Sequence, residues 1–345
     1  MNLNTMMTLA REGADKFGIA HCDNYASFID EPENYLRLEA EIRELEEYVG
    51  HKLDMKPSGY ALSRISSIQW CKYGFNVFDV TDSLLAGLLL TTPSDEPGFP
   101  RFPYPAFMIR IPPGFIPLEE RGRYVEEKRE SWLTQISVNH FKELQFGSGE
   151  ALSLVISTGN QDNRPDDVSE IILLRGYAST AEFLKGDEAR WESLEMKNPN
   201  PRYLETDNVA MRAAIRIVAN LCSWIESIGG ISGQKPSNAL LKRMGNKKKP
   251  RITQWIMGRE VKLEPDLLRS AKEHILGLDS RRSPAGWHLT TRFPVRGHMR
   301  RQACGKNWSE RKVIWIKPFF HGPQGGDVMA HIYKAGDGKK PATQS

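Results

Sequence analysis

Apolar residues recur with the 3.6-residue period of an amphipathic helix in several segments of this chain. The first ordered segment is expected where Leu38, Ile42, Leu45 and Val49 fall on one face. The clearest helix is the long one that ends before the glycine pair Gly229-Gly230. The predicted helices cover residues 34–49, residues 60–73, a segment that begins at residue 81 or 82, residues 207–227 and residues 265–276.

Between residues 100 and 175 the apolar residues recur at every second position instead. Phe107, Ile109 and Ile111 alternate with Met108 and Arg110, which is typical of a half-buried strand. Similar short patterns predict strands around residues 132–138, 152–156 and 171–174, and the short spacing between them favours antiparallel pairing. A further strand is predicted at residues 313–316 and is expected to pair with part of residues 287–295.

These patterns predict an α+β fold with a helical N-terminal part, a central and mostly antiparallel sheet, and a basic C-terminal module that contains a β-hairpin. The predicted divisions are a helical region at 1–95, the sheet with its long helix at 96–230, a basic linker at 231–252, the basic module at 253–333 and a disordered tail at 334–345.

Composition excludes several classes of protein. Hydrophobic residues make up 40% and charged residues 26% of the 345 positions, as in ordinary globular chains. The longest apolar run falls well short of the ~20 residues that a membrane-spanning helix needs, and the N-terminus lacks a signal-peptide pattern. The four cysteines form no CxxC pair, which argues against a disulfide framework or a zinc ribbon. We therefore expect a cytoplasmic protein without a membrane partner.

Charge is distributed unevenly along the chain. Residues 231–345 hold 24 Lys and Arg against 8 Asp and Glu, whereas the first 230 residues hold 23 against 35. A basic region of this kind attracts polyanions of any sequence, because each neutralised phosphate releases a counterion. Aromatic rings among the cations add surfaces on which unpaired bases can stack.

RNA binding is therefore predicted for the cations, the aromatic residues and one histidine of the C-terminal module. These residues are Arg292, Arg296, His298, Arg300, Arg301, Lys306, Trp308, Arg311, Lys312, Trp315 and Lys317. The alternative for this basic region is that it docks on the acidic segment Glu39–Glu47 of the same chain. Trp315 is also compatible with a core position.

The usual catalytic signatures are absent from the sequence. There is no P-loop, no GxGxxG after a strand, no HExxH and no GxSxG, and we predict no cofactor and no metal. One enzymatic alternative remains, a metal-independent ribonuclease in which His298, between Arg296 and Arg300, acts as general acid or base. His288 or His321 would then supply the second proton transfer. A third alternative is an interaction protein whose basic face meets an acidic protein partner.

Two stretches together resemble a type V anti-CRISPR family whose members depress production of the Cas effector nuclease. The more specific stretch is Phe293-Pro-Val-Arg-Gly-His-Met-Arg-Arg-Gln302, followed by Gly305, Ser309, Arg311, Ile314-Trp-Ile-Lys-Pro318 and Gly322. The second runs from Trp70-Cys-Lys-Tyr73 through Phe78-Asp-Val-Thr81, read as an Asp-containing turn, to the strand around residues 107–111. Met299 stands where the family pattern has tryptophan.

The resemblance implies a non-catalytic protein of a mobile element that acts in the bacterial cytoplasm while its target is being synthesised. Its expected partners are RNA or a ribosome-associated nascent chain, including an N-terminal peptide of the effector nuclease. The central sheet would offer an edge or groove for that peptide at Phe107, Ile109 and Ile111.

Overall fold

A computed structural model of the chain defines the fold. It describes residues 3–18, 22–24, 27–28, 30–50, 57–93, 101–121, 128–141, 151–160, 168–174, 201–231, 252–275, 291–322 and 327–328. Within these ranges, helices and sheets occur together, which confirms the α+β class. No helix in them is long and apolar enough to cross a membrane.

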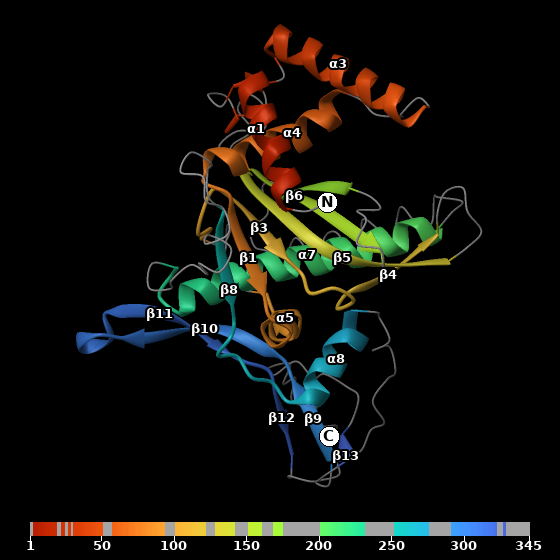
Figure 1. The fold of residues 1–345 in the computed structure, drawn as a ribbon. Helices are drawn as coiled ribbons and strands as arrows, with labels where there is room; N and C mark the ends of the chain where they lie inside the picture. Colours follow the sequence, from red (N-terminus) through yellow and green to blue (C-terminus); the bar gives the residue numbers. More distant parts are fainter. Residues whose placement is uncertain are drawn as a thin grey trace, which may run out of the picture.

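A seven-stranded mixed sheet forms the centre of the molecule (Figure 1). Its strands follow the order β7-β6-β5-β3-β1-β8, and β4 pairs with β5 beside this path. Strand β1 runs parallel to both of its neighbours, while the other pairs are antiparallel. The strands are β1 (Asn76–Val80), β3 (Ala106–Arg110), β4 (Pro117–Arg121), β5 (Lys128–Phe141), β6 (Ala151–Asn160), β7 (Val168–Leu174) and β8 (Thr253–Met257).

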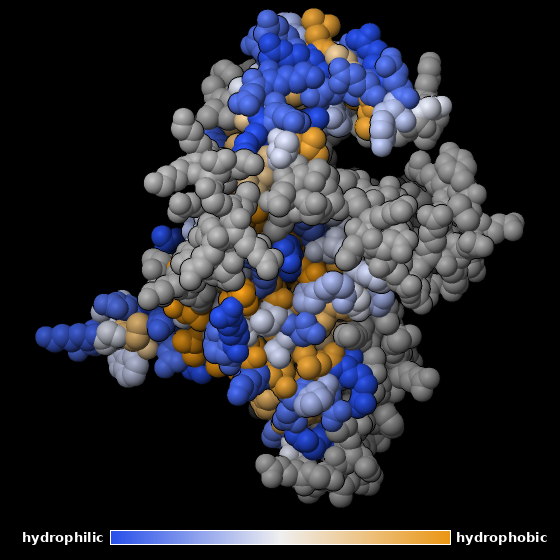
Figure 2. All heavy atoms as spheres, viewed as in Figure 1, coloured by the Kyte–Doolittle hydropathy of each residue, from blue (hydrophilic) through white to orange (hydrophobic). Residues whose placement is uncertain are grey.

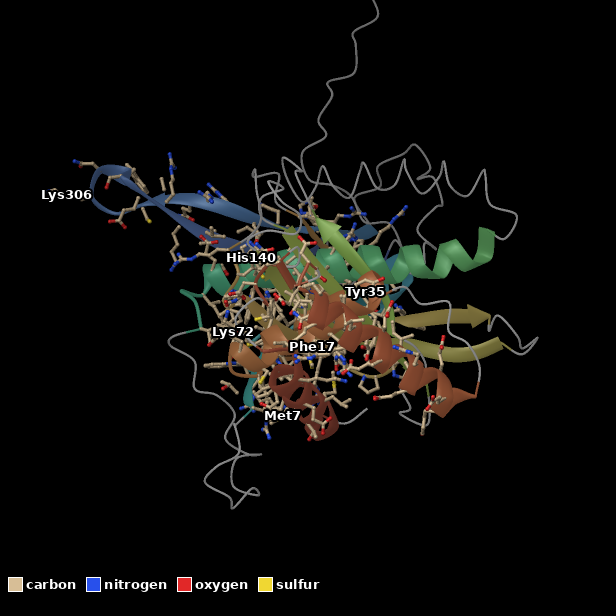
Figure 3. The ribbon with its side chains drawn as sticks, turned by 90° about the horizontal axis from the view of Figure 1, so that it is seen from above. Met7, Phe17, Tyr35, Lys72, His140 and Lys306 are labelled. Carbon is tan, nitrogen blue, oxygen red and sulfur yellow. The ribbon has the colours of Figure 1, made fainter. Side chains whose placement is uncertain are left out.

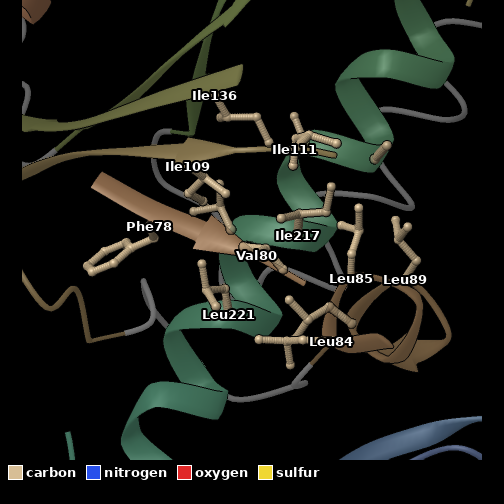
Figure 4. Packing of buried hydrophobic residues seen from close by; sticks show 14 of the residues in the cluster. Phe78, Val80, Leu84, Leu85, Leu89, Ile109, Ile111, Ile136, Ile217 and Leu221 are labelled. Carbon is tan, nitrogen blue, oxygen red and sulfur yellow. The ribbon is translucent and has the colours of Figure 1, made fainter. Parts of the chain in front are cut away.

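Helices cover both faces of this sheet. On one face, Phe78, Ile109 and Ile136 pack against α7 (Pro201–Ser227) and α5 (Asp82–Leu89), and Figure 4 shows Ile217 and Leu221 of α7 close to them. On the other face, Val77 and Met108 pack against α1 (Leu3–Phe17) and α4 (Pro57–Lys72). Alternate residues of the same strands therefore enter two separate cores, and β3 is buried on both sides rather than half-buried.

The N-terminal helices form a layer above the second face. Helix α3 (Pro32–Val49) packs Leu38 against Ile65 of α4, and its Glu41 is buried between the two helices. The Glu41 carboxylate contacts Lys16 at 3.1 Å and Arg64 at 2.6 Å, and it accepts a hydrogen bond from the Tyr60 hydroxyl. Burial raises the pKa of Tyr60 to about 12. The buried carboxylate is thus compensated by two cations and a phenol.

Two small sheets complete the C-terminal part. The first has the order β11-β10-β2 and the second β12-β9-β13, with α8 (Pro265–Ile275) nearby (Figure 1). Strand β2 belongs to the turn that follows α5, so the first small sheet is attached directly to the main core. The strands are β2 (Thr91–Thr92), β9 (Thr291–Val295), β10 (Gly297–Cys304), β11 (Glu310–Ile316), β12 (Phe319–His321) and β13 (Asp327–Val328).

Several predicted elements are confirmed and four need correction. All five predicted helices and the strands of the central sheet occur, but helix α1 was not expected. Strand β1 occupies most of the segment Phe78–Thr81, for which the family resemblance predicts a turn. Strand β8 pairs with β1 of the central sheet, so residues on either side of the predicted linker share one sheet. Strand β11 pairs with β10, while β9, within the range expected to be its partner, pairs with β12. Most of the predicted linker and the predicted tail lie outside the described residues.

Candidate nucleic-acid interface

Strands β10 and β11 form a hairpin that is held at its root by β2. The backbone amide of Gly297 donates to the carbonyl of Leu90 at 3.1 Å, and Gly297 and His298 pair with Thr91 and Thr92. A Cβ atom on Gly297 would lie 2.6 Å from the Thr91 hydroxyl and 2.9 Å from the carbonyl oxygen of Ile316. Glycine is required here because the two strands and β2 approach each other too closely for a side chain.

Trp315 anchors the hairpin to α5. Its ring lies so close to Gly87 that a Cβ atom there would be 2.8 Å from the ring carbons. The indole nitrogen donates to the Thr91 hydroxyl at 3.0 Å, and this hydroxyl donates in turn to the carbonyl of Gly87 at 2.6 Å. Met299, directly opposite Trp315, packs against the same core. Trp315 and Met299 are therefore anchoring residues and do not form an exposed stacking surface.

Helix α7 fixes this attachment from the other side. The buried amide of Asn220 donates to the carbonyls of Leu88 and Thr91 at 2.8 and 2.9 Å. These two bonds tie α7 to the last turn of α5 and to β2. Sequence reasoning missed Gly87, Thr91 and Asn220, because their roles arise from contacts between residues far apart in the chain.

Beyond the root, the hairpin projects away from the body of the molecule. We call residues 300–313 the arm. Figure 2 shows it as a largely hydrophilic projection, and Figure 3 places Lys306 at its far end. Six of the predicted binding residues are exposed on it, namely Arg300, Arg301, Lys306, Trp308, Arg311 and Lys312. The structure therefore brings about half of the predicted set together on one projecting element.

The tip of the arm has an unusual backbone. Gly305 adopts φ 76° and ψ −177°, a region accessible essentially to glycine alone, and Asn307 and Trp308 have φ of 56° and 59°. Left-handed conformations are rare for a residue as bulky as tryptophan. The Trp308 side chain is 70% exposed, so its strained backbone presents a large apolar ring to solvent.

The other predicted cations lie near the root and have different surroundings. Arg292 forms an ion pair with Glu264 at 3.0 Å and lies over the ring of Phe320. Arg296 is half-buried, and the exposed Lys317 donates to the carbonyl of Lys262. The predicted set therefore divides into an arm group and a root group, and Arg292 in the root group is already neutralised.

The peptide edge expected at β3 requires correction. Strand β3 is hydrogen-bonded to β1 on one side and to β5 on the other, so it has no free edge. The side chains of Phe107, Ile109 and Ile111 are buried. These three residues contribute to the core, and an added strand has no place beside them.

His298 is exposed at the start of β10. The nearest residues on its face of the hairpin are Ile316, directly opposite, and Arg300, two positions along the strand. Neither exchanges a proton at neutral pH. His288 lies outside the described residues. Among the described residues, no group of three His, Cys, Asp or Glu side chains is arranged to hold a metal ion.

The acidic helix α3 does not lie against the arm. Figure 1 shows α3 at the top of the molecule and β10 and β11 at the lower left, on opposite sides of the central sheet. A pocket of about 390 Å³ between α1, α3 and α4 is lined by Glu12, Lys16, Glu44 and Arg64, among others. Because this pocket mixes both signs of charge, it offers no surface for a polyanion.

Comparison with models of known protein families shows the family to which this chain belongs. The AcrVA2-like family model, described as the anti-CRISPR type V subtype A2 family, matches residues 78–320. No curated protein matches the chain significantly. The matched region begins within β1 and ends within β12, so it contains the main sheet, α5, α7 and the whole β10–β11 hairpin, whereas α1, α3 and α4 precede it.

Proposed function

Because this chain belongs to the anti-CRISPR type V subtype A2 family, we propose that it lowers production of a type V effector nuclease by binding RNA through the arm. The family membership gives the anti-defence role. The observation that carries the RNA-binding part of the proposal is the exposure of five cations and a tryptophan on one projecting hairpin.

Electrostatics supports RNA as the partner. Between Arg300 and Lys312 the arm carries five cations and a single carboxylate, Glu310. Such a surface binds phosphate with little regard to sequence and loses affinity as salt rises. If all five cations contact phosphates, the logarithm of the association constant should fall with the logarithm of salt concentration with a slope of about −4.

A charge-neutralised arm tests the proposal. We would replace Arg300, Arg301, Lys306, Arg311 and Lys312 by glutamine and measure binding to labelled effector messenger RNA over a range of salt. We expect the variant to lose RNA binding together with its salt dependence. Co-expression with a type V effector should then leave the amount of effector protein close to the level without the inhibitor.

A matched control removes exposed cations from other parts of the molecule. Arg43 on α3 and Arg101, which precedes β3, are exposed and do not belong to the hairpin, so their glutamine variants should retain RNA binding and the decrease in effector protein. Undiminished RNA binding by the arm variant would contradict the proposal. So would an undiminished decrease in effector protein.

The same experiment separates the two alternatives. An acidic protein partner predicts no RNA binding by the wild-type protein, although the arm variant would still lose its effect on the effector. A ribonuclease centred on His298 predicts RNA cleavage that His298→Ala abolishes. We favour binding because the described neighbours of His298 on its hairpin face include no second proton-transfer group.

A further inference from the structure

The cations of the arm lie on both of its faces. In an antiparallel pair, residues directly opposite each other project to the same side, and successive residues alternate between sides. Lys312 stands opposite Gln302, which shares a face with Arg300, whereas Arg311 stands opposite Ala303, which shares a face with Arg301. Arg300 and Lys312 therefore occupy one face, and Arg301 and Arg311 the other.

This two-sided arrangement differs from that of a strand whose single face rests on a ligand. If the arm lay flat on RNA, one pair of cations would contact phosphates and the other would remain in water. The four cations of both faces, Arg300, Arg301, Arg311 and Lys312, are solvent-exposed, and Figure 1 shows the hairpin extending clear of the other described elements. A ligand with phosphates on two sides would use both pairs.

The tip supplies a third kind of contact. Trp308 is 70% exposed at the end of the arm, next to Lys306, and its conformation is fixed by a turn that needs a glycine at 305. An exposed indole ring stacks on a nucleobase only if that base is unpaired and accessible. The arm thus combines phosphate contacts along both sides with a stacking contact at its end.

We infer that the arm inserts into an interrupted RNA stem, with a phosphate strand on each face and an unpaired base stacked on Trp308. A continuous A-form duplex does not fit, because its major groove is too narrow and deep for side chains to enter. A flexible single strand does not fit either, because it offers only one row of phosphates. A bulge or internal loop opens the groove and supplies an unpaired base. This inference rests on the proposed RNA binding and specifies its substrate class.

Three RNA probes test the inference. They are a stem interrupted by a bulge of a few nucleotides, the same stem fully paired, and a single strand that carries the bulge sequence. We expect the wild-type protein to bind the bulged stem about tenfold more tightly than the other two at the same salt concentration. Equal affinity for all three probes would overturn the inference while leaving RNA binding itself intact.

Two double variants test insertion directly. Arg300→Gln with Lys312→Gln removes the cations of one face, and Arg301→Gln with Arg311→Gln removes those of the other. If the arm inserts, each pair should reduce the salt slope on the bulged stem by about 2. If only one pair matters, the arm lies flat on its ligand and the inference is wrong. Unchanged urea midpoints would show that both variants remain folded.

Trp308→Ala tests the stacking contact. The variant should lose about tenfold in affinity for the bulged stem and little for the paired stem, so that the preference between them disappears. Trp308→Phe should retain most of the preference. A Trp308→Ala variant that still prefers the bulged stem would contradict the stacking assignment. Absence of wild-type binding to every probe would instead overturn the proposed function.

Discussion

The root and the arm of the β10–β11 hairpin belong to the same two strands, yet their residues have opposite surroundings. At the root, Trp315 packs on α5, Met299 packs against the main hydrophobic core, and Gly297 fits where no side chain can. On the arm, cations on both faces and Trp308 at the tip are exposed to solvent. The two tryptophans show the contrast most clearly. The ring of Trp315 packs against Gly87 and its nitrogen donates to the Thr91 hydroxyl, whereas the ring of Trp308 lies mostly in water. Substitutions at the root should therefore lower the free energy of unfolding, and substitutions on the arm should lower the affinity for RNA.

The largest effect is expected for Trp315→Ala. The change removes a ring packed against Gly87 and leaves the Thr91 hydroxyl without its donor, so the free energy of unfolding should fall by about 3 kcal/mol. Urea unfolding measures this change. Trp308→Ala is the matched control and should alter stability by less than about 0.5 kcal/mol. Equal losses for both variants would remove the distinction between root and arm.

Gly297→Ala should have the next largest effect. The new methyl group would meet the Thr91 hydroxyl and the Ile316 carbonyl, and a backbone oxygen cannot move aside as a flexible side chain can. We expect a loss of about 2 kcal/mol in thermal or urea unfolding. Ser309→Ala, at the exposed end of the arm, provides the comparison and should change little. A Gly297→Ala protein as stable as the wild type would show that β2 does not hold the hairpin closely.

Thr91→Val tests the hydrogen bonds of the root with little change in shape. The variant loses the acceptor for the Trp315 indole nitrogen and the donor to the Gly87 carbonyl, and we expect a loss of about 1.5 kcal/mol in urea unfolding. Thr91→Ser keeps the hydroxyl and should recover part of this loss. If the serine variant is no more stable than the valine variant, the methyl group matters more than the hydroxyl.

The reactivity of the cysteine thiols compares the core with the arm in the wild-type protein, without any substitution. Burial raises the pKa of the Cys222 thiol, and it raises the pKa of Cys22 to about 11. At about pH 8 both are therefore protonated, and the thiolate is the form that reacts with alkylating reagents. Cys304, half-buried on the arm, should be alkylated before either of them, as measured by mass spectrometry of the peptides. Alkylation of Cys222 at the rate of Cys304 would indicate that the core opens readily.

The sequence predicted the central core well because burial leaves a periodic pattern. Strands β3, β5 and β6 and helix α7 each bury a regular set of apolar positions, and these were recognised. Strand β10 escaped recognition because its arm has no buried face, so residues such as Arg300 and Arg301 show no apolar alternation. Its partner β11 was consequently assigned to the wrong strand.

The candidate site was only partly predictable for a related reason. Local composition identified the cations, but it could not distinguish Arg292, which Glu264 neutralises, from Arg311 on the exposed arm. That distinction depends on pairing between segments far apart in the chain. The residues that fix the root, such as Asn220 on α7 and Gly87 on α5, likewise acquire their roles only when these helices meet.

The family match begins within β1, so a fragment that contains only the matched residues lacks the helices that cover one face of the sheet. Met108 of β3 faces Met7 and Ala10 of α1 and Trp70 of α4, which come before the matched region. A fragment cut at the start of the match would expose the apolar side of its own innermost strands. We therefore expect the shared segment of this chain to aggregate when it is produced without α1 and α4, unless another protein covers that side.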